Sequence, residues 1–161
     1  MIGEITSVLE ALRGWPGAVW LRGSGTAYLF VNAAHILGIA LALGAILPLD
    51  LRLLGLARRA PLDLLAPFLI RCAATGLVLA IPTGLWLFSV KPADYLVNAA
   101  FLWKLGLLAL AFLNIALQHR NPAFAAAGHR ITRTCRTRLH AAMSMLLWLG
   151  VLLAGRWVGF L

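Results

Sequence analysis

The sequence predicts an all-α integral membrane protein, a four-helix bundle with a short amphipathic helix near its N-terminus. Hydrophobic residues make up 62% of the 161 residues and charged residues only 12%, whereas soluble domains are nearer one half and one quarter. Four stretches are apolar and long enough to cross a bilayer as single helices. The first residues differ, because they place apolar side chains at helical spacing beside charged ones.

Residues 2–15 are expected to form an amphipathic helix that lies in the membrane interface. Its apolar side chains recur at helical spacing and are Ile2, Ile5, Val8, Leu9 and Leu12. The charged residues Glu4, Glu10 and Arg13 fall mostly on the remaining surface. Pro16 follows directly and is expected to end this helix.

The four membrane spans are expected at residues 26–49, 64–90, 99–117 and 139–161. Pro48 and Asp50 are expected to close the first span, and Pro82 is expected to kink the second. Small residues recur every four positions in the second span and predict close helix contact, at Gly76, Ala80 and Gly84. The connection to the third span is short, so the second and third spans are expected to be antiparallel neighbours.

Arginines concentrate in and beside the first and third connections between the spans. They are Arg52, Arg58, Arg59, Arg71, Arg120, Arg130, Arg133, Arg136 and Arg138. The positive-inside rule places these residues in the cytoplasm, which predicts a multi-pass protein of the bacterial inner membrane with both termini in the periplasm. Topology therefore explains the net charge of +9 without a nucleic-acid partner. Cys72 and Cys135 fall toward the reducing cytoplasmic side and are expected to be free thiols.

A layer of ionisable residues is expected in the outer half of the membrane. At a rise of about 1.5 Å per residue, His35 lies roughly 4 Å, Lys104 about 6 Å and Arg156 about 9 Å outward from the midpoints of their spans. Asn32 precedes His35 by one helical turn. None of the expected spans contains Asp or Glu, and a buried cation without an anion is costly.

A bound acidic cofactor would balance these cations, and heme b is the candidate. A neutral imidazole binds heme iron, while Lys or Arg pairs with the propionates. His35 is then the axial ligand, with Lys104, Arg156 and Asn32 as further cofactor-binding candidates. In the alternative interpretation, Lys104 and Arg156 extend to the headgroups and His35 is a hydrogen-bonded residue of the helix interface.

A second layer is expected near the cytoplasmic edge, with His119, His140, Arg71 and Asp50. Histidines on facing helices of a bundle can bind heme or a metal ion. His119 and His140 are therefore candidate metal ligands beside His35, and Arg71 is a candidate cofactor-binding residue. Because both histidines lie at headgroup level, solvated side chains without a ligand are the alternative. His129 lies in the third loop and is expected to be solvated.

Three segments carry a resemblance to known membrane proteins. They are HILGIALALGAILPLDLRLLG (His35–Gly55), FLWKLGLLALAFLN (Phe101–Asn114) and the following Gln118–His119 pair. They resemble an uncharacterised family of small four-span bacterial membrane proteins. That family is distantly similar to copper-resistance D-type domains and to HemJ-type membrane protoporphyrinogen oxidases. The resemblance implies a heme-binding, redox-linked bundle in which His35 and Lys104 are the notable polar residues.

These observations favour a b-type heme protein with an electron-transfer or porphyrin-linked redox role. If the protein is an enzyme, an oxidoreductase is expected. The alternatives are a non-enzymatic membrane subunit or assembly factor, and a small permease for a metal or solute. With only four spans, a homo-oligomer or a membrane complex is expected. The chain has no GxSxG, HExxH, Walker or dinucleotide motif, so the enzyme classes that use these motifs are not indicated.

Overall fold

The computed structural model describes residues 2–56, 61–120 and 134–160, and these residues are almost entirely helical. The elements are α1 (Ile2–Gly14), α2 (Pro16–Gly23), α3 (Gly25–Leu54), α4 (Leu62–Val90), α5 (Pro92–Val97), α6 (Ala99–His119), α8 (Cys135–Trp157) and the 3₁₀ turn η1 (Val158–Phe160). Helices α3, α4, α6 and α8 are long and apolar enough to cross a membrane. This confirms the predicted all-α bundle of membrane helices.

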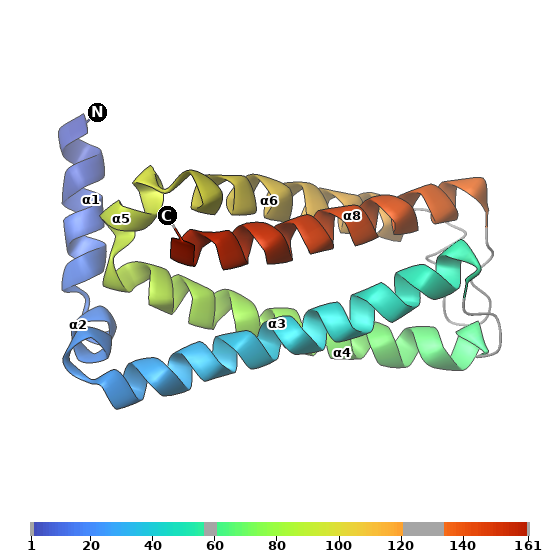
Figure 1. Ribbon diagram of the computed structural model, residues 1–161, viewed down its shortest axis with the longest axis horizontal. Helices are drawn as coiled ribbons and strands as arrows, with labels where there is room; N and C mark the ends of the chain where they lie inside the picture. Colours follow the sequence, from blue (N-terminus) through green and yellow to red (C-terminus); the bar gives the residue numbers. More distant parts are fainter. Residues whose placement is uncertain (1, 57–60, 121–133, 161) are drawn as a thin grey trace.

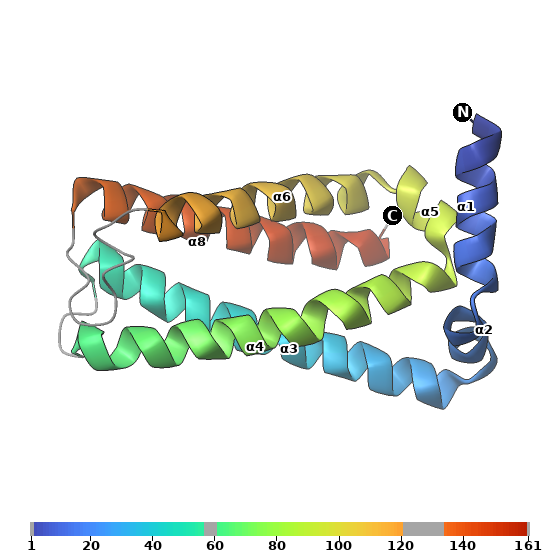
Figure 2. The same ribbon diagram turned by 180° about the vertical axis from the view of Figure 1, so that it is seen from behind.

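The long helices form two pairs, which lie one above the other in Figure 1. Helix α3 packs against α4, α6 packs against α8, and contacts between α3 and α8 join the two pairs. The prediction that the second and third spans are neighbours is wrong, because α4 and α6 belong to different pairs. The view from behind shows the same arrangement (Figure 2). Both termini lie at one end of the bundle, where α1 runs across the ends of the long helices (Figure 1). That orientation is the one expected of a helix that lies along a membrane surface.

Helices α3 and α4 approach closely because small residues line their contact. Gly38 and Ala42 of α3 are buried against Gly76 and Ala80 of α4, so that the two backbones touch. The small-residue spacing in the second span thus predicts a true helix–helix contact. At the inner half, leucines and alanines from α3, α4 and α8 complete an apolar core around the fully buried Leu53.

Helix α3 is longer than the sequence analysis expected, and the predicted end of the first span is wrong. The helix passes through Pro48 and ends at Leu54, where Gly55 adopts the left-handed conformation with φ 95° and donates its N–H to the carbonyl of Arg52. Membrane helices tolerate an internal proline because neighbouring helices satisfy the backbone groups that it frees. Asp50 is therefore part of the helix rather than the residue that closes it.

Two short helices, α2 and α5, lie where the sequence analysis expected only connections. Each begins with a proline, Pro16 or Pro92, at a first-turn position that needs no backbone N–H. The indole Nε1 of Trp86 donates to the carbonyl oxygen of Gly17 at 3.0 Å, which attaches α2 to α4. Helix α8 begins at Cys135, before the predicted Leu139, because the Thr134 hydroxyl accepts the Thr137 N–H at 3.2 Å.

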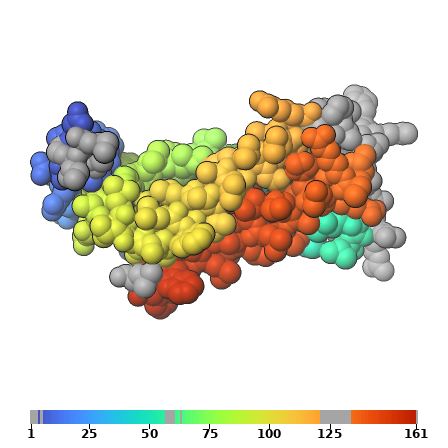
Figure 3. Space-filling view, turned by 90° about the horizontal axis from the view of Figure 1, so that it is seen from above, coloured from blue at the N-terminus to red at the C-terminus, as the bar shows by residue number. Residues whose placement is uncertain are grey.

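The outer faces of the long helices carry large exposed apolar side chains. Examples are Phe30, Val78, Trp103 and Leu153, one on each long helix. Figure 3 shows α6 and α8 packed side by side along the upper face of the bundle. A belt of exposed apolar side chains on every long helix is suited to contact with lipid. Cys72 and Cys135 are both free thiols, as predicted.

Candidate functional site

The imidazole of His35 is held by the facing helix α4. Its Nδ1 lies 2.9 Å from the carbonyl oxygen of Ala80 and 3.2 Å from the hydroxyl oxygen of Thr83. The Thr83 hydroxyl already donates to a carbonyl of its own helix, at 2.6 Å. Because a carbonyl oxygen can only accept, Nδ1 carries the proton and donates to both oxygens. The Nε2 atom of a neutral His35 therefore keeps its lone pair.

A glycine creates the space in which the His35 ring lies. A β-carbon on Gly84 of α4 would come within 2.8 Å of the ring carbon Cε1. Of the three small residues spaced four apart in α4, Gly84 thus makes room for the histidine ring. Gly76 and Ala80 instead allow the backbone contact with α3. The histidine is half-buried, so α4 fixes its orientation without enclosing the ring.

Lys104 lies in the same outer half and is directed toward α8. Its aliphatic carbons pass along Gly155, where a β-carbon would meet Cε at 3.5 Å. The ammonium group is close enough to His35 for an electrostatic interaction between the two side chains. Because Lys104 is half-buried and packs against α8, it lies within the bundle rather than along its lipid face. The two residues that were predicted at similar depth thus lie within electrostatic range of each other.

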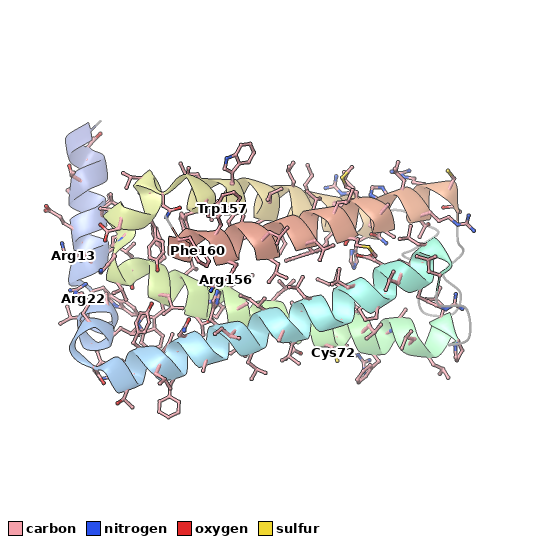
Figure 4. The ribbon with its side chains drawn as sticks, in the orientation of Figure 1. Arg13, Arg22, Cys72, Arg156, Trp157 and Phe160 are labelled. Atoms are coloured by element: carbon pink, nitrogen blue, oxygen red, sulfur yellow. The ribbon has the colours of Figure 1, made fainter. Side chains whose placement is uncertain are left out.

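The remaining candidates of the outer layer lie around this pair. Arg156, at the end of α8, is exposed and holds its guanidinium 4.6 Å from the centre of the Phe160 ring. Figure 4 shows that Arg156 extends from α8 on the side of α3 and α4. Asn32 is half-buried one turn before His35. Arg156 is also the neighbour of Gly155, against which Lys104 packs, so the two cations lie at the same end of α8.

The inner histidines have separate environments. The Nδ1 of His140 in α8 lies 2.7 Å from the amide oxygen of Asn114 in α6, and the amide nitrogen of Asn114 donates to the His140 carbonyl at 3.0 Å. His119 is exposed, and its Nδ1 donates to the Ile115 carbonyl of its own helix at 2.9 Å. The sequence indicated His140 as a candidate but not Asn114 as its partner.

Arg71 lies apart from the His35 group. It is exposed on α4, about 14 Å of helix rise from the Ala80 that holds His35. Within residues 2–56, 61–120 and 134–160, no three His, Cys, Asp or Glu side chains come together as metal ligands would. His129 and the arginines Arg58, Arg59, Arg130 and Arg133 lie outside the described residues.

The expectation that the spans contain no acid is wrong, because Asp50 lies inside α3. Only 4% of its surface is exposed, and the hydroxyl of Ser144 in α8 donates to its carboxylate. The carboxylate lies about 22 Å along α3 from His35, so it does not neutralise Lys104. Among the described residues, the outer layer keeps the excess of positive charge that the sequence predicted.

Comparison with known proteins gives one family. The model of a family described as a family of unknown function (DUF6644) matches residues 14–161. The chain belongs to this family. No curated protein and no solved structure matches the chain, and the comparisons give no support for the relation to copper-resistance D-type or HemJ-type proteins. For this DUF6644 member, any function must therefore be argued from the residues themselves.

Proposed function

We propose that this DUF6644 protein binds a b-type heme in the outer half of its bundle, with His35 as an axial ligand. The observation that carries the proposal is the hydrogen bond from His35 Nδ1 to the Ala80 carbonyl. Histidines that bind metals commonly donate their second ring N–H to such an acceptor, which fixes the tautomer and leaves Nε2 for the metal. Thr83 and Gly84 complete the support of this ring from α4.

The positive charge beside His35 supports an acidic cofactor. Lys104 lies within the electrostatic reach of the imidazole, and Arg156 follows the glycine against which Lys104 packs. Lys104 and Arg156 would hold the propionates, which supply the negative charge that the outer half of the spans lacks. A bound heme supplies one-electron redox chemistry. The role of the chain is then to hold the heme in an apolar bundle and to neutralise its acidic groups.

The proposal also assigns an orientation in the bacterial inner membrane. Arg52, Arg120, Arg136 and Arg138 lie at or beside the helix ends opposite the two termini. The positive-inside rule then places both termini in the periplasm and the His35 group in the periplasmic half. Labelling of a cysteine introduced near residue 10 by a membrane-impermeant reagent in intact spheroplasts tests this orientation. The Cys72→Ser, Cys135→Ser background removes the native thiols, and protection of the new cysteine would reverse the orientation.

A reduced-minus-oxidised absorption spectrum tests the heme proposal. Protein purified from cells with ample heme supply should show a Soret band, and His35→Ala should lose it while remaining helical by circular dichroism. His119→Ala is the matched control, because the His119 ring is exposed and bonded to its own helix. A wild-type protein without a Soret band would contradict the proposal. A non-enzymatic subunit or a permease would then be the better interpretation.

A further inference from the structure

The buried polar side chains of the described residues gather at the end of the bundle away from the termini. They are Asp50, Arg52, Asn114, Gln118, Thr137 and Ser144, whereas Ser89 lies toward the other end. They come from α3, α6 and α8, and contacts between α3 and α8 join the two helix pairs. The heme proposal uses none of them. Polar groups inside an apolar membrane bundle are costly unless they are hydrogen-bonded. Ionisable residues kept at such a cost usually have a function.

Asp50 is the acid of this cluster, and its hydrogen bonding is incomplete. The Ser144 hydroxyl donates to the carboxylate, but Oδ2 is buried without a hydrogen-bond partner among the described residues. A buried charged carboxylate without a cation is far more costly than a protonated one. The unpartnered oxygen is therefore a natural place for a proton.

The charged and titratable groups around Asp50 come from each neighbouring helix. Arg52 is two positions further along α3, a spacing that places side chains on different faces of a helix. Arg71 of α4 and His119 of α6 are exposed. His140 of α8 lies one turn before Ser144, on the same face. His140 is thus the titratable group in line with the Ser144–Asp50 contact.

The hydrogen bonds of His140 leave it able to take up a proton. An amide nitrogen only donates, so the bond from Asn114 Nδ2 to the His140 carbonyl fixes the direction of the amide. The amide oxygen then accepts from Nδ1 at 2.7 Å, and Nε2 keeps a lone pair in the neutral ring. His140 is half-buried near the start of α8. It therefore lies between the end of the bundle and the buried carboxylate.

We propose that Asp50 binds a proton at the junction of α3, α6 and α8, and that His140 delivers it. A proton taken up at His140 Nε2 passes to the Asp50 carboxylate. The N–H bond breaks, an O–H bond forms, and a neutral imidazole and a neutral carboxylic acid result. A metal cation is the weaker alternative, because hard cations need several oxygen ligands and Asp50 is joined by one hydroxyl, that of Ser144. The proposal does not depend on heme binding at His35.

Infrared spectroscopy of the full chain in liposomes tests whether Asp50 holds the proton. At neutral pH the wild type should show the C=O stretch of a protonated carboxylic acid, which shifts in D₂O. Asp50→Asn should lose this band, and Asp94→Asn, which changes an exposed acid of α5, should retain it. Ser144→Ala should move the band to higher frequency, because a hydrogen bond to the carboxyl group is lost. This variant assigns the band to Asp50 even if Asp50→Asn does not fold.

The delivery role is tested by the rate at which the same band shifts after transfer into D₂O. His140→Gln should slow the shift, whereas His119→Gln should leave its rate unchanged. Absence of the band from the wild type at neutral pH would overturn the proton site. Loss of the band on addition of sodium chloride at constant pH would overturn it in favour of a cation site. An unchanged rate in His140→Gln would overturn the role of His140.

Discussion

Gly38 of α3 and Gly76 of α4 meet backbone to backbone at the crossing of the two helices. A β-carbon on Gly38 would lie 2.9 Å from the carbonyl oxygen of Gly76, and one on Gly76 would lie 2.7 Å from the carbonyl oxygen of Gly38. The neighbouring contacts are also to backbone atoms, those of Ala80 and Ala42. Backbone cannot move aside as a flexible side chain can, so this crossing tolerates no larger residue without separation of the helices.

The first prediction concerns this crossing. Gly76→Ala should destabilise the bundle by about 1–3 kcal/mol, the usual cost of overpacking a well-packed interface. Gly106→Ala is the matched control, because a β-carbon on Gly106 meets nothing within 4 Å. Equilibrium unfolding in detergent micelles, followed by circular dichroism, measures both variants. Equal stability of the two variants would contradict the contact.

The second prediction concerns the Asn114–His140 pair. Asn114→Ala leaves the half-buried His140 Nδ1–H without its acceptor and should cost about 1–3 kcal/mol of stability. Because each residue is the other's partner, a double variant with His140→Ala should cost less than the two single changes together. The difference should be about 0.5–3 kcal/mol in a double-mutant cycle. Asn114→Ala combined with His119→Ala should instead be additive. Additivity in both cycles would show that the pair is not coupled.

The third prediction concerns the space beneath His35 and rests on the heme proposal. Gly84→Val should displace the imidazole, because even a β-carbon on residue 84 would lie 2.8 Å from its Cε1. The reduced-minus-oxidised spectrum should then be lost or shifted relative to the wild type. Gly106→Val adds the same side chain at an open position and should leave the spectrum unchanged. An unaltered spectrum in Gly84→Val would argue against His35 as the ligand.

The fourth prediction concerns pH and Tyr95 of α5. Burial, followed by the nearby Tyr28 hydroxyl and the Asp94 carboxylate, raises the pKa of Tyr95 above its ordinary value. An unfolded tyrosine loses its proton near pH 10, so between that pH and the folded pKa the folded state binds more protons. Stability should therefore fall as the pH rises through this window.

Alkaline titration followed by tyrosinate absorbance measures the pKa of Tyr95 directly. The chain has only two tyrosines, so Tyr28→Phe isolates the Tyr95 signal and should also reduce its shift. Tyr95→Phe should flatten the fall in unfolding free energy above pH 10. If Tyr95 in the folded Tyr28→Phe variant had the same pKa as in the unfolded protein, its buried environment would be contradicted.

The sequence predicts the membrane helices well because lipid imposes a simple rule. An apolar stretch of sufficient length must form a helix to satisfy its own backbone, and periodicity then shows which residues share a face. His35, Gly38 and Ala42 recur at helical spacing on one face of α3, and all three pack on α4. The end of α3 could not be predicted, because Pro48 is a breaker in water but is tolerated in a packed membrane helix.

The sequence predicted how deep the candidate site residues lie in the membrane, but not which residues of neighbouring helices they contact. Helical rise alone placed His35 and Lys104 at similar levels, since both lie in long apolar helices. It could not show that Asn114, rather than His119, binds His140, because that depends on the rotation of α6 against α8. The Asp50–Ser144 contact was missed for the same reason, and because the predicted span ended before Asp50.

The contact between α3 and α8 has a consequence for the order in which the protein is made. Asp50 lies in α3, which leaves the ribosome before α4, α6 and α8, and the Ser144 that covers it lies in α8. During synthesis the carboxylate remains uncovered until α8 inserts, while the α3–α4 crossing can form as soon as α4 has emerged. Burial of Asp50 therefore reports that α3 and α8 have come together in the membrane.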